Sequence, residues 1–262
     1  MEEKKLYPMR LLGTERGYME TLIGGGWLGG TTLDELMEKD KSICYLDCDL
    51  MGCINTKRLQ QHYPDRAFQA GIAEGNAAGV AAGLATCGKI PFVVTYAAFG
   101  SMRICEMIRQ EICYTNLNVK IACSHGGVTP ANDGASHQAI EDMGILRTIP
   151  NIAVIMPADY NSTRKLVRQA GTTEGPVYLR FTRNGMPDIY GPDEQFEFGK
   201  AKLLRPGKDA AIFAIGDTVR LALEAAKQLS AEGIDVRVID MHTIKPLDTA
   251  CVAAAARDTG KI

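Results

Sequence analysis

The stretch EGNAAGVAAGLATCGKIPFVVTYAAF, residues 74–99, joins two kinds of local pattern. Its first part, residues 74–87, is rich in Ala and Gly and has the spacing of a helix. Its second part, residues 91–95, is an apolar run with β-branched residues, too short for a helix. The stretch therefore predicts a helix followed by a buried strand.

The same alternation continues on both sides of this stretch. Strand and helix patterns in regular succession are typical of a doubly wound, mostly parallel α/β sheet, and this is the fold class that we expect. Further strands are predicted at residues 43–47, 119–123, 152–156, 177–182, 210–216 and 236–240, and further helices at 101–114, 136–147, 159–170, 219–231 and 247–256.

A polar stretch with Pro and Gly, NGMPDIYGPDEQFEFGK at residues 184–200, interrupts the alternation. Such composition is typical of a linker, so we expect two domains, residues 1–190 and 191–262. Two strands and two helices are too little for a typical core, so the second domain is expected to be incomplete at Ile262. Another glycine-rich stretch, Gly24–Thr32, is expected to be a flexible loop.

The composition is that of an ordinary globular protein. Of the 262 residues, 46% are hydrophobic and 23% charged, and the net charge is −2, so neither disorder nor nucleic-acid binding is expected. The N-terminal MEEKKLYPMR lacks the apolar segment of a signal peptide, and no apolar run approaches the roughly 18 residues of a membrane span. We therefore expect a cytoplasmic protein without membrane contact.

The cysteines form no CxxC pair and are predicted to be reduced, buried thiols. Three of them lie close together, but their spacing matches neither a ferredoxin nor a zinc pattern, so we expect no metal site in this chain. The eight cysteines are residues 44, 48, 53, 87, 105, 113, 123 and 251.

Chemically versatile side chains follow the predicted strands. In open α/β sheets ligands bind beyond the carboxyl ends of the strands, so these side chains predict a site for a polar substrate. They are Asp47, Asp49, Tyr96, Phe99, His125, Asp159 and Arg183. In the loop that follows the predicted strand at residues 119–123, His125 and His137 flank Asp133. Imidazoles in such a loop can bind a ligand or shuttle protons. The alternative is that Asp133 or Ser136 caps the next helix and both histidines are solvated.

Each remaining candidate also has a structural explanation. Glu74 begins a helix, where the helix dipole favours a carboxylate, yet its small and apolar neighbours also suit a buried acid–base group. Tyr96 and Phe99 are either core aromatics or part of the site. Arg183 either holds an anionic group or makes a surface ion pair. The small residues of the helix that begins at Glu74 suit packing on its own sheet or on another subunit.

Eight stretches, taken in order, resemble the C-terminal half of transketolase in the form in which two genes encode the two halves. The resemblance covers nearly the whole chain from about Ile43. The stretches are LDCDL (46–50), PDRAFQAGIAEGNAAGVAAGLA (64–85), KIPFVVTYAAF (89–99), RQEICYTNLNVKIACSHGG (109–127), NDGASHQAIEDMG (132–144), IPNIAVIMPAD (149–159), GPVYLRFTR (175–183) and VIDMHTIKPLD (238–248).

The resemblance implies thiamine diphosphate as the cofactor and a two-carbon ketol unit moved between sugar phosphates. Glu74 would bond to N1′ of the cofactor's aminopyrimidine, Tyr96 and Phe99 would stack near that ring, and Asp49 would line the cleft. The sugar would meet four residues: its carbonyl and hydroxyls would contact His125, Asp133 and His137, and its phosphate would contact Arg183. Glu74, His125 and His137 would be the catalytic residues.

The family's diphosphate and Mg²⁺ site uses a GDG motif, and this chain contains none. The resemblance therefore implies a separate N-terminal, diphosphate-binding partner subunit that carries the Mg²⁺ ligands. It also implies self-association through the pyrimidine-binding and C-terminal domains, giving a heterotetramer.

The chain departs from the family pattern at Gly75, where relatives carry Gln or His, at Tyr96, where Phe is usual, and over Thr129–Asn132. These departures leave the substrate open. Two related alternatives are a 2-oxo acid dehydrogenase β subunit and a deoxyxylulose-phosphate synthase. A third is a non-catalytic regulatory subunit of the same fold.

Overall fold

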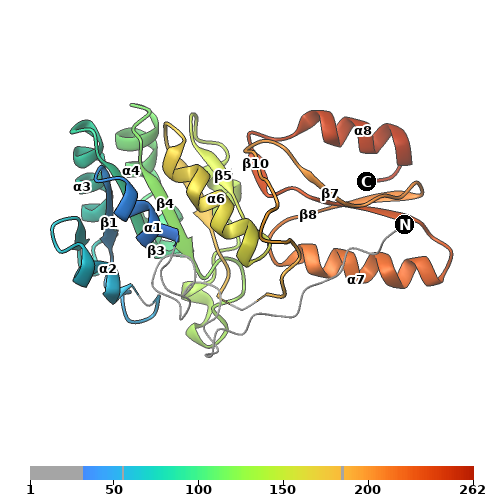
Figure 1. Cartoon of the computed structure of the whole chain (residues 1–262), viewed down its shortest axis with the longest axis horizontal. Helices are drawn as coiled ribbons and strands as arrows, with labels where there is room; N and C mark the ends of the chain where they lie inside the picture. The colour runs from blue at the N-terminus through green and yellow to red at the C-terminus, as the bar shows by residue number, and fades with distance from the viewer. Residues whose placement is uncertain (1–31, 55, 184–185) are drawn as a thin grey trace.

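The computed structural model describes residues 32–54, 56–183 and 186–262 (Figure 1). The Gly24–Thr32 stretch lies outside the described residues except for Thr32, which begins the first helix. No helix in the described part of the chain combines the length and the apolar character needed to cross a membrane.

A seven-stranded sheet forms the larger part of the molecule, with strand order β10-β5-β6-β4-β3-β1-β2. Neighbouring strands are parallel except for β10, which pairs antiparallel with β5. This arrangement confirms the predicted fold class. The strands are β1 (Ile43–Asp47), β2 (Ala67–Gln69), β3 (Ile90–Tyr96), β4 (Lys120–Ser124), β5 (Ala153–Ile155), β6 (Val177–Arg180) and β10 (Thr243–Lys245).

Helices cover both faces of this sheet, so its central strands are buried on both sides (Figure 1). Side chains alternate between the faces along β3: Phe92 and Val94 pack in one core and Val93 in the other. The helices are α1 (Thr32–Lys39), α2 (Lys57–His62), α3 (Glu74–Thr86), α4 (Cys105–Met107), α5 (Asp142–Leu146) and α6 (Tyr160–Thr172).

Two predicted helices differ from those observed. The segment expected at residues 101–114 is wound as two π-helices, Phe99–Arg103 and Ile108–Cys113, on either side of α4. The helix expected at 136–147 shrinks to α5, preceded by the 3-10 turns Ala131–Asp133 and Ala135–His137. The sequence patterns also missed the short elements α1, α2 and β2.

A second, three-stranded sheet has the order β7-β9-β8, and helices α7 and α8 lie on its opposite faces (Figure 1). Its elements are β7 (Lys202–Arg205), β8 (Ala210–Ala214), α7 (Thr218–Ala231), β9 (Val236–Asp240) and α8 (Thr249–Thr259). Between β9 and α8 the chain returns to the large sheet as β10, an element that the sequence patterns missed along with β7. The division at residue 190 stays a prediction.

The cysteines are all unpaired thiols, but not all are buried. Burial was expected throughout, and it is wrong for Cys53 and Cys87, which are exposed. Cys53 lies in the turn after β1, and Cys87 is the residue that ends α3, so neither is held within an element that packs on the sheet.

Candidate functional site

Four aromatic rings gather at the carboxyl ends of β3 and β4. The parallel register pairs Tyr96 with Ser124, so Tyr96 and His125 leave neighbouring strands side by side. Their ring centroids are 3.9 Å apart with planes 30° from parallel. His137 lies edge-on to Tyr96 at 5.9 Å and to Phe99 at 5.2 Å. The structure thus brings together four of the predicted site residues as one ring cluster: Tyr96, Phe99, His125 and His137.

Glu74 is buried beside this ring cluster at the start of α3, with 3% of its surface exposed. Its Oε2 accepts a hydrogen bond from Nη1 of Arg103 at 2.9 Å. Among the described residues, its Oε1 has a long contact, 3.5 Å, with the hydroxyl of Thr95. The guanidinium of Arg103 also lies over the ring of Phe99, 4.3 Å from the ring centroid. A carboxylate, a planar cation and an aromatic face therefore meet at one point.

Sequence reasoning missed Arg103 and Thr95. Arg103 follows Phe99 by four residues, a spacing that brings side chains together on a helix and was the available signal. Its bond to Glu74 crosses 29 positions of the sequence and had no local signal.

The rim of the site is polar and charged. The carboxylate of Asp133 lies 3.9 Å from Nε2 of His125 and 3.7 Å from Nη1 of Arg183. Arg183 is fixed by donating to the backbone oxygen of Pro130 at 2.7 Å, and its backbone N–H donates to the hydroxyl of Thr129. The structure therefore places Asp133 between His125 and Arg183; the strand-end pattern selects His125 and Arg183, and the loop between the histidines suggests Asp133.

His125 is a neutral base at physiological pH. Burial, with the positive charge of Arg183 adding to its effect, lowers the pKa of His125 to about 4. Its Nδ1 lies 2.9 Å from the hydroxyl of Ser124, so Nε2 is the nitrogen that faces Asp133. A neutral imidazole in this position can donate to a carbonyl or hydroxyl oxygen, or accept from a hydroxyl.

Two glycines allow the backbone to approach closely here. A Cβ on Gly100 would lie 2.2 Å from Sγ of Cys123, and one on Gly126 would lie 2.3 Å from Nε of Arg180. Gly100 thus lets the turn after Phe99 sit against β4, and Gly126 lets the loop after His125 sit against β6.

Two strand-end aspartates hold the scaffold rather than the rings. Asp47 is buried and accepts from the Tyr45 hydroxyl and the Gln69 side chain, which ties β1 to β2. Asp159 caps α6 and also accepts from the backbone N–H groups of residues 189 and 190. Both carboxylates serve hydrogen bonds within the fold.

Asp49 is exposed, and its backbone N–H donates to Gln69. Within the described residues, no contact links its side chain to the ring cluster, so its place in a cofactor cleft stays a prediction.

The residues present suit a flat nitrogen heterocycle. The guanidinium of Arg103 already shows that a planar N–H donor fits over Phe99 while bonding to Glu74. A metal ion is a different matter, because no group of three or more His, Cys, Asp or Glu side chains in the described ranges is arranged to bind one.

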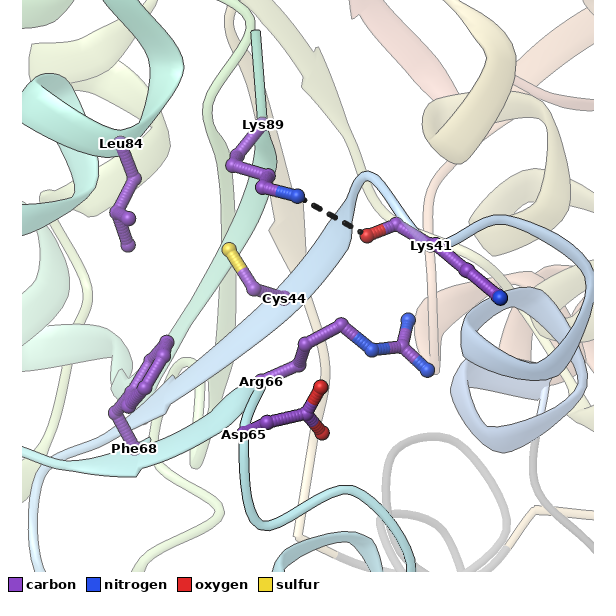
Figure 2. Close-up of a pocket in the computed structure, with 7 residues that line it drawn as sticks. All are labelled: Lys41, Cys44, Asp65, Arg66, Phe68, Leu84 and Lys89. Atoms are coloured by element: carbon purple, nitrogen blue, oxygen red, sulfur yellow. Dashed lines mark hydrogen bonds between the residues drawn. The ribbon is translucent and has the colours of Figure 1, made fainter. Parts of the chain in front are cut away.

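A pocket of about 460 Å³ lies elsewhere, at the amino ends of the strands (Figure 2). Lys41 and Lys89 come just before β1 and β3, at the opposite edge of the sheet from the ring cluster. Nη1 of Arg66 in this pocket donates to backbone oxygens of residues 37, 40 and 43. The pocket is lined by Lys41, Cys44, Asp65, Arg66, Phe68, Leu84 and Lys89.

Comparison with known families matches both parts of the chain. The family described as the pyrimidine binding domain of transketolase matches residues 28–188, and the C-terminal domain of transketolase matches residues 199–262. The chain belongs to the transketolase family. Membership implies dependence on thiamine diphosphate and a transferase-type enzyme subunit.

Named transketolase relatives share most of the chain. A protein of Methanocaldococcus jannaschii, described as a transketolase C-terminal section, is 43% identical over 90% of this chain and 72% of its own length. The 6-deoxy-6-sulfo-D-fructose transketolase subunit SqwH of a Clostridium species is 41% identical over 90% of this chain and 74% of its own.

A solved structure, described as a split gene transketolase in an inactive beta4 tetramer, has a TM-score of 0.81 with this transketolase chain. It is 48% identical and covers 87% of this chain and 74% of its own.

Proposed function

We propose that this chain is the pyrimidine-binding subunit of a two-subunit transketolase that moves a two-carbon ketol unit between sugar phosphates. The observation that carries the proposal is the buried carboxylate of Glu74 beside the ring cluster, at the carboxyl edge of a parallel sheet. When bound, thiamine diphosphate supplies a nucleophilic carbon that breaks and forms a carbon–carbon bond next to a ketone. The protein binds, orients and moves protons.

The residues divide between cofactor and sugar. Glu74 would hold and exchange a proton at N1′ of the pyrimidine, and Phe99 and Tyr96 would bury the ring faces, with Asp49 at the mouth of the cleft. His125 and His137 would bond to the sugar's carbonyl and hydroxyl oxygens. The neutral state of His125 suits this role, because it can donate from Nε2 without adding positive charge to the site.

The anionic end of the sugar would meet Arg183 beside Asp133. The planar guanidinium of Arg183 matches the oxygens of a phosphate, and it suits a sulfonate equally well. A relative named for a sulfonated sugar makes this comparison worthwhile, so both sugar classes belong in the assay.

A second subunit is required by this proposal. The absence of a GDG motif from the sequence supports a partner that holds the diphosphate and Mg²⁺. The solved relative, described as an inactive beta4 tetramer, also supports activity that depends on a partner. We place the pyrimidine-binding domain at residues 1–190 and the C-terminal domain at 191–262, and propose that both contribute to self-association in a heterotetramer.

The test is to copurify the chain with a diphosphate-binding subunit and measure ketol transfer from xylulose 5-phosphate to ribose 5-phosphate, with thiamine diphosphate and Mg²⁺. Glu74→Gln is expected to lower turnover by at least about 100-fold, because it removes the proton-exchanging group. Glu106→Gln, an exposed glutamate on α4, is the matched control and should retain full activity.

Three results would overturn the proposal in different ways. Decarboxylation of pyruvate would favour a dehydrogenase β subunit or a deoxyxylulose-phosphate synthase. Transfer from a sulfonated ketose alone would keep the chemistry and change the substrate. A cofactor-loaded complex without turnover on any donor would favour a regulatory subunit.

A further inference from the structure

Arg103 makes two contacts of the kind that a flat ligand with N–H groups would make in the same place. Its Nη1 donates to Oε2 of Glu74 at 2.9 Å, and its guanidinium carbon lies 4.3 Å from the ring centroid of Phe99. A guanidinium is planar, carries N–H donors at its edge and stacks on aromatic faces. An aminopyrimidine shares the planarity and the stacking face, and its ring nitrogen bonds to a carboxyl group.

We propose that Arg103 holds the place of the cofactor's pyrimidine and has to leave before that ring can bind. The proposal rests on the function proposed above, which assigns Glu74 and Phe99 to the pyrimidine. Both ligands would need the same oxygen and the same aromatic face, so they exclude one another. Arg103 is thus a positioning residue that keeps the carboxyl of Glu74 oriented until the ring replaces it.

The burial of the two partners favours movement of the arginine. The side chain of Glu74 is 3% exposed and Arg103 is 51% exposed, so the carboxylate is enclosed while the guanidinium reaches it from solvent. A half-exposed guanidinium can leave the carboxylate at a modest cost in free energy, because water replaces much of the hydrogen bonding that it loses. The carboxylate has no comparable freedom.

The backbone around Arg103 is also irregular. Arg103 is the last residue of the first π-helix, and Ile104 after it has φ −109° and ψ 19°, outside helical values. The side chain therefore extends from a break between two helical segments. Single-turn π-helical segments are frequent at functional sites.

The test measures binding of thiamine diphosphate with Mg²⁺ to the complex of this chain and its diphosphate-binding partner, by calorimetric titration and stopped-flow fluorescence. Arg103→Met keeps the length of the side chain and removes the charge and the plane. It is expected to lower the Kd about tenfold and to speed association, since the ring no longer displaces a charge-assisted hydrogen bond. Arg109→Met, at an exposed position six residues on, is the matched control and should change neither.

Arg103→Lys covers the case in which Arg103→Met folds poorly. It keeps a cation for Glu74 but has no plane to stack on Phe99, so the gain in affinity should be smaller than for Met. Weaker or unchanged binding in both variants would overturn the proposal, because Arg103 would then support the bound ring or play no part.

Glu74→Gln in the same titration separates the two proposals. If wild type and Glu74→Gln bind the cofactor equally, the function assigned to Glu74 fails. If Glu74→Gln binds more weakly while Arg103→Met shows no gain, only the role of Arg103 fails.

Discussion

His125 and His242 are both buried imidazoles, one in the ring cluster and one beside β10. Burial lowers the pKa of each to about 4, from an ordinary value near 6.5. Nδ1 of His242 lies 2.9 Å from the hydroxyl of Thr243, and its ring meets Phe196 edge-on at 5.3 Å. Both side chains are therefore neutral in the folded chain at pH 7.

This burial predicts loss of stability in mild acid. Between pH 6.5 and 4 the unfolded chain binds more protons at these sites than the folded chain, so the free energy of unfolding falls as the pH falls. Each histidine is expected to contribute up to about 3 kcal/mol of this loss, at about 1.4 kcal/mol per pKa unit. Urea unfolding of wild type, His125→Gln and His242→Gln at pH 7 and pH 4.5 measures it. An equal loss in all three proteins would contradict the prediction.

At the scale of residues, the strand-end rule selected Tyr96, Phe99, His125 and Arg183, and the structure places them at one edge because parallel strands deliver their following residues there. It also selected Asp159, whose carboxylate serves only the fold in the described contacts. A rule based on position does not distinguish a carboxylate that caps a helix from one that meets a ligand.

Among the elements, α3 has one packed face and one open face. Ala77, Ala78, Ala81 and Ala82 are buried, whereas Val80 is 42% exposed between Gly79 and Gly83. The sequence left open whether the small residues serve the sheet or another subunit. The buried alanines serve the sheet, and the open face remains available for self-association.

Val80→Arg is expected to weaken self-association without unfolding the chain, because the exposed position accepts a long side chain in solvent and an apolar interface does not. Sedimentation velocity over a range of concentrations measures the dissociation constant, and a rise of about tenfold or more is expected for a buried, unpaired charge. Val80→Thr, which is nearly the same size, is the control. Unchanged association in Val80→Arg would place the interface elsewhere.

The strands were easier to predict than the two helices expected at residues 101–114 and 136–147, which differ from the observed ones. Apolar runs marked β1 and β9 at their observed bounds, since both are buried in a sheet. The helix expected at 136–147 begins late because Ala139 exchanges two backbone hydrogen bonds with Gly127, which holds that part extended. A contact twelve residues away overrides the local pattern. In the 99–113 segment the apolar spacing predicts a helix but does not reveal its π winding.

In the whole molecule, the second sheet is joined to the first through a close contact at Gly216. This residue has φ +58°, and a Cβ there would lie 2.1 Å from Cε of Met156 at the end of β5. Met156 is buried, and its sulfur accepts from Arg180 at 3.0 Å, so it has little room to move. The backbone of Met156 also donates to His242 at 2.9 Å.

Gly216→Ala is therefore expected to lower the free energy of unfolding by about 2–4 kcal/mol, combining left-handed backbone strain with overpacking. Gly233→Ala is a matched control, because Gly233 has φ +81° with no atom within 4 Å of the added Cβ. Its cost should be the strain alone, about 1–2 kcal/mol. Equal costs in urea unfolding would mean that the contact with Met156 adds nothing.

The antiparallel pairing of β10 with β5 sets an order of events during protein synthesis. Ile155 pairs with Thr243, which lies 88 residues later in the chain, so the ribosome delivers this outer strand after the other described strands of the large sheet. Until then the nascent chain presents β5 as an open edge, the kind of surface on which other strands add. β10 thus covers the edge of the large sheet that would otherwise be open to unwanted pairing, although it lies between β9 and α8, two elements of the second sheet's region.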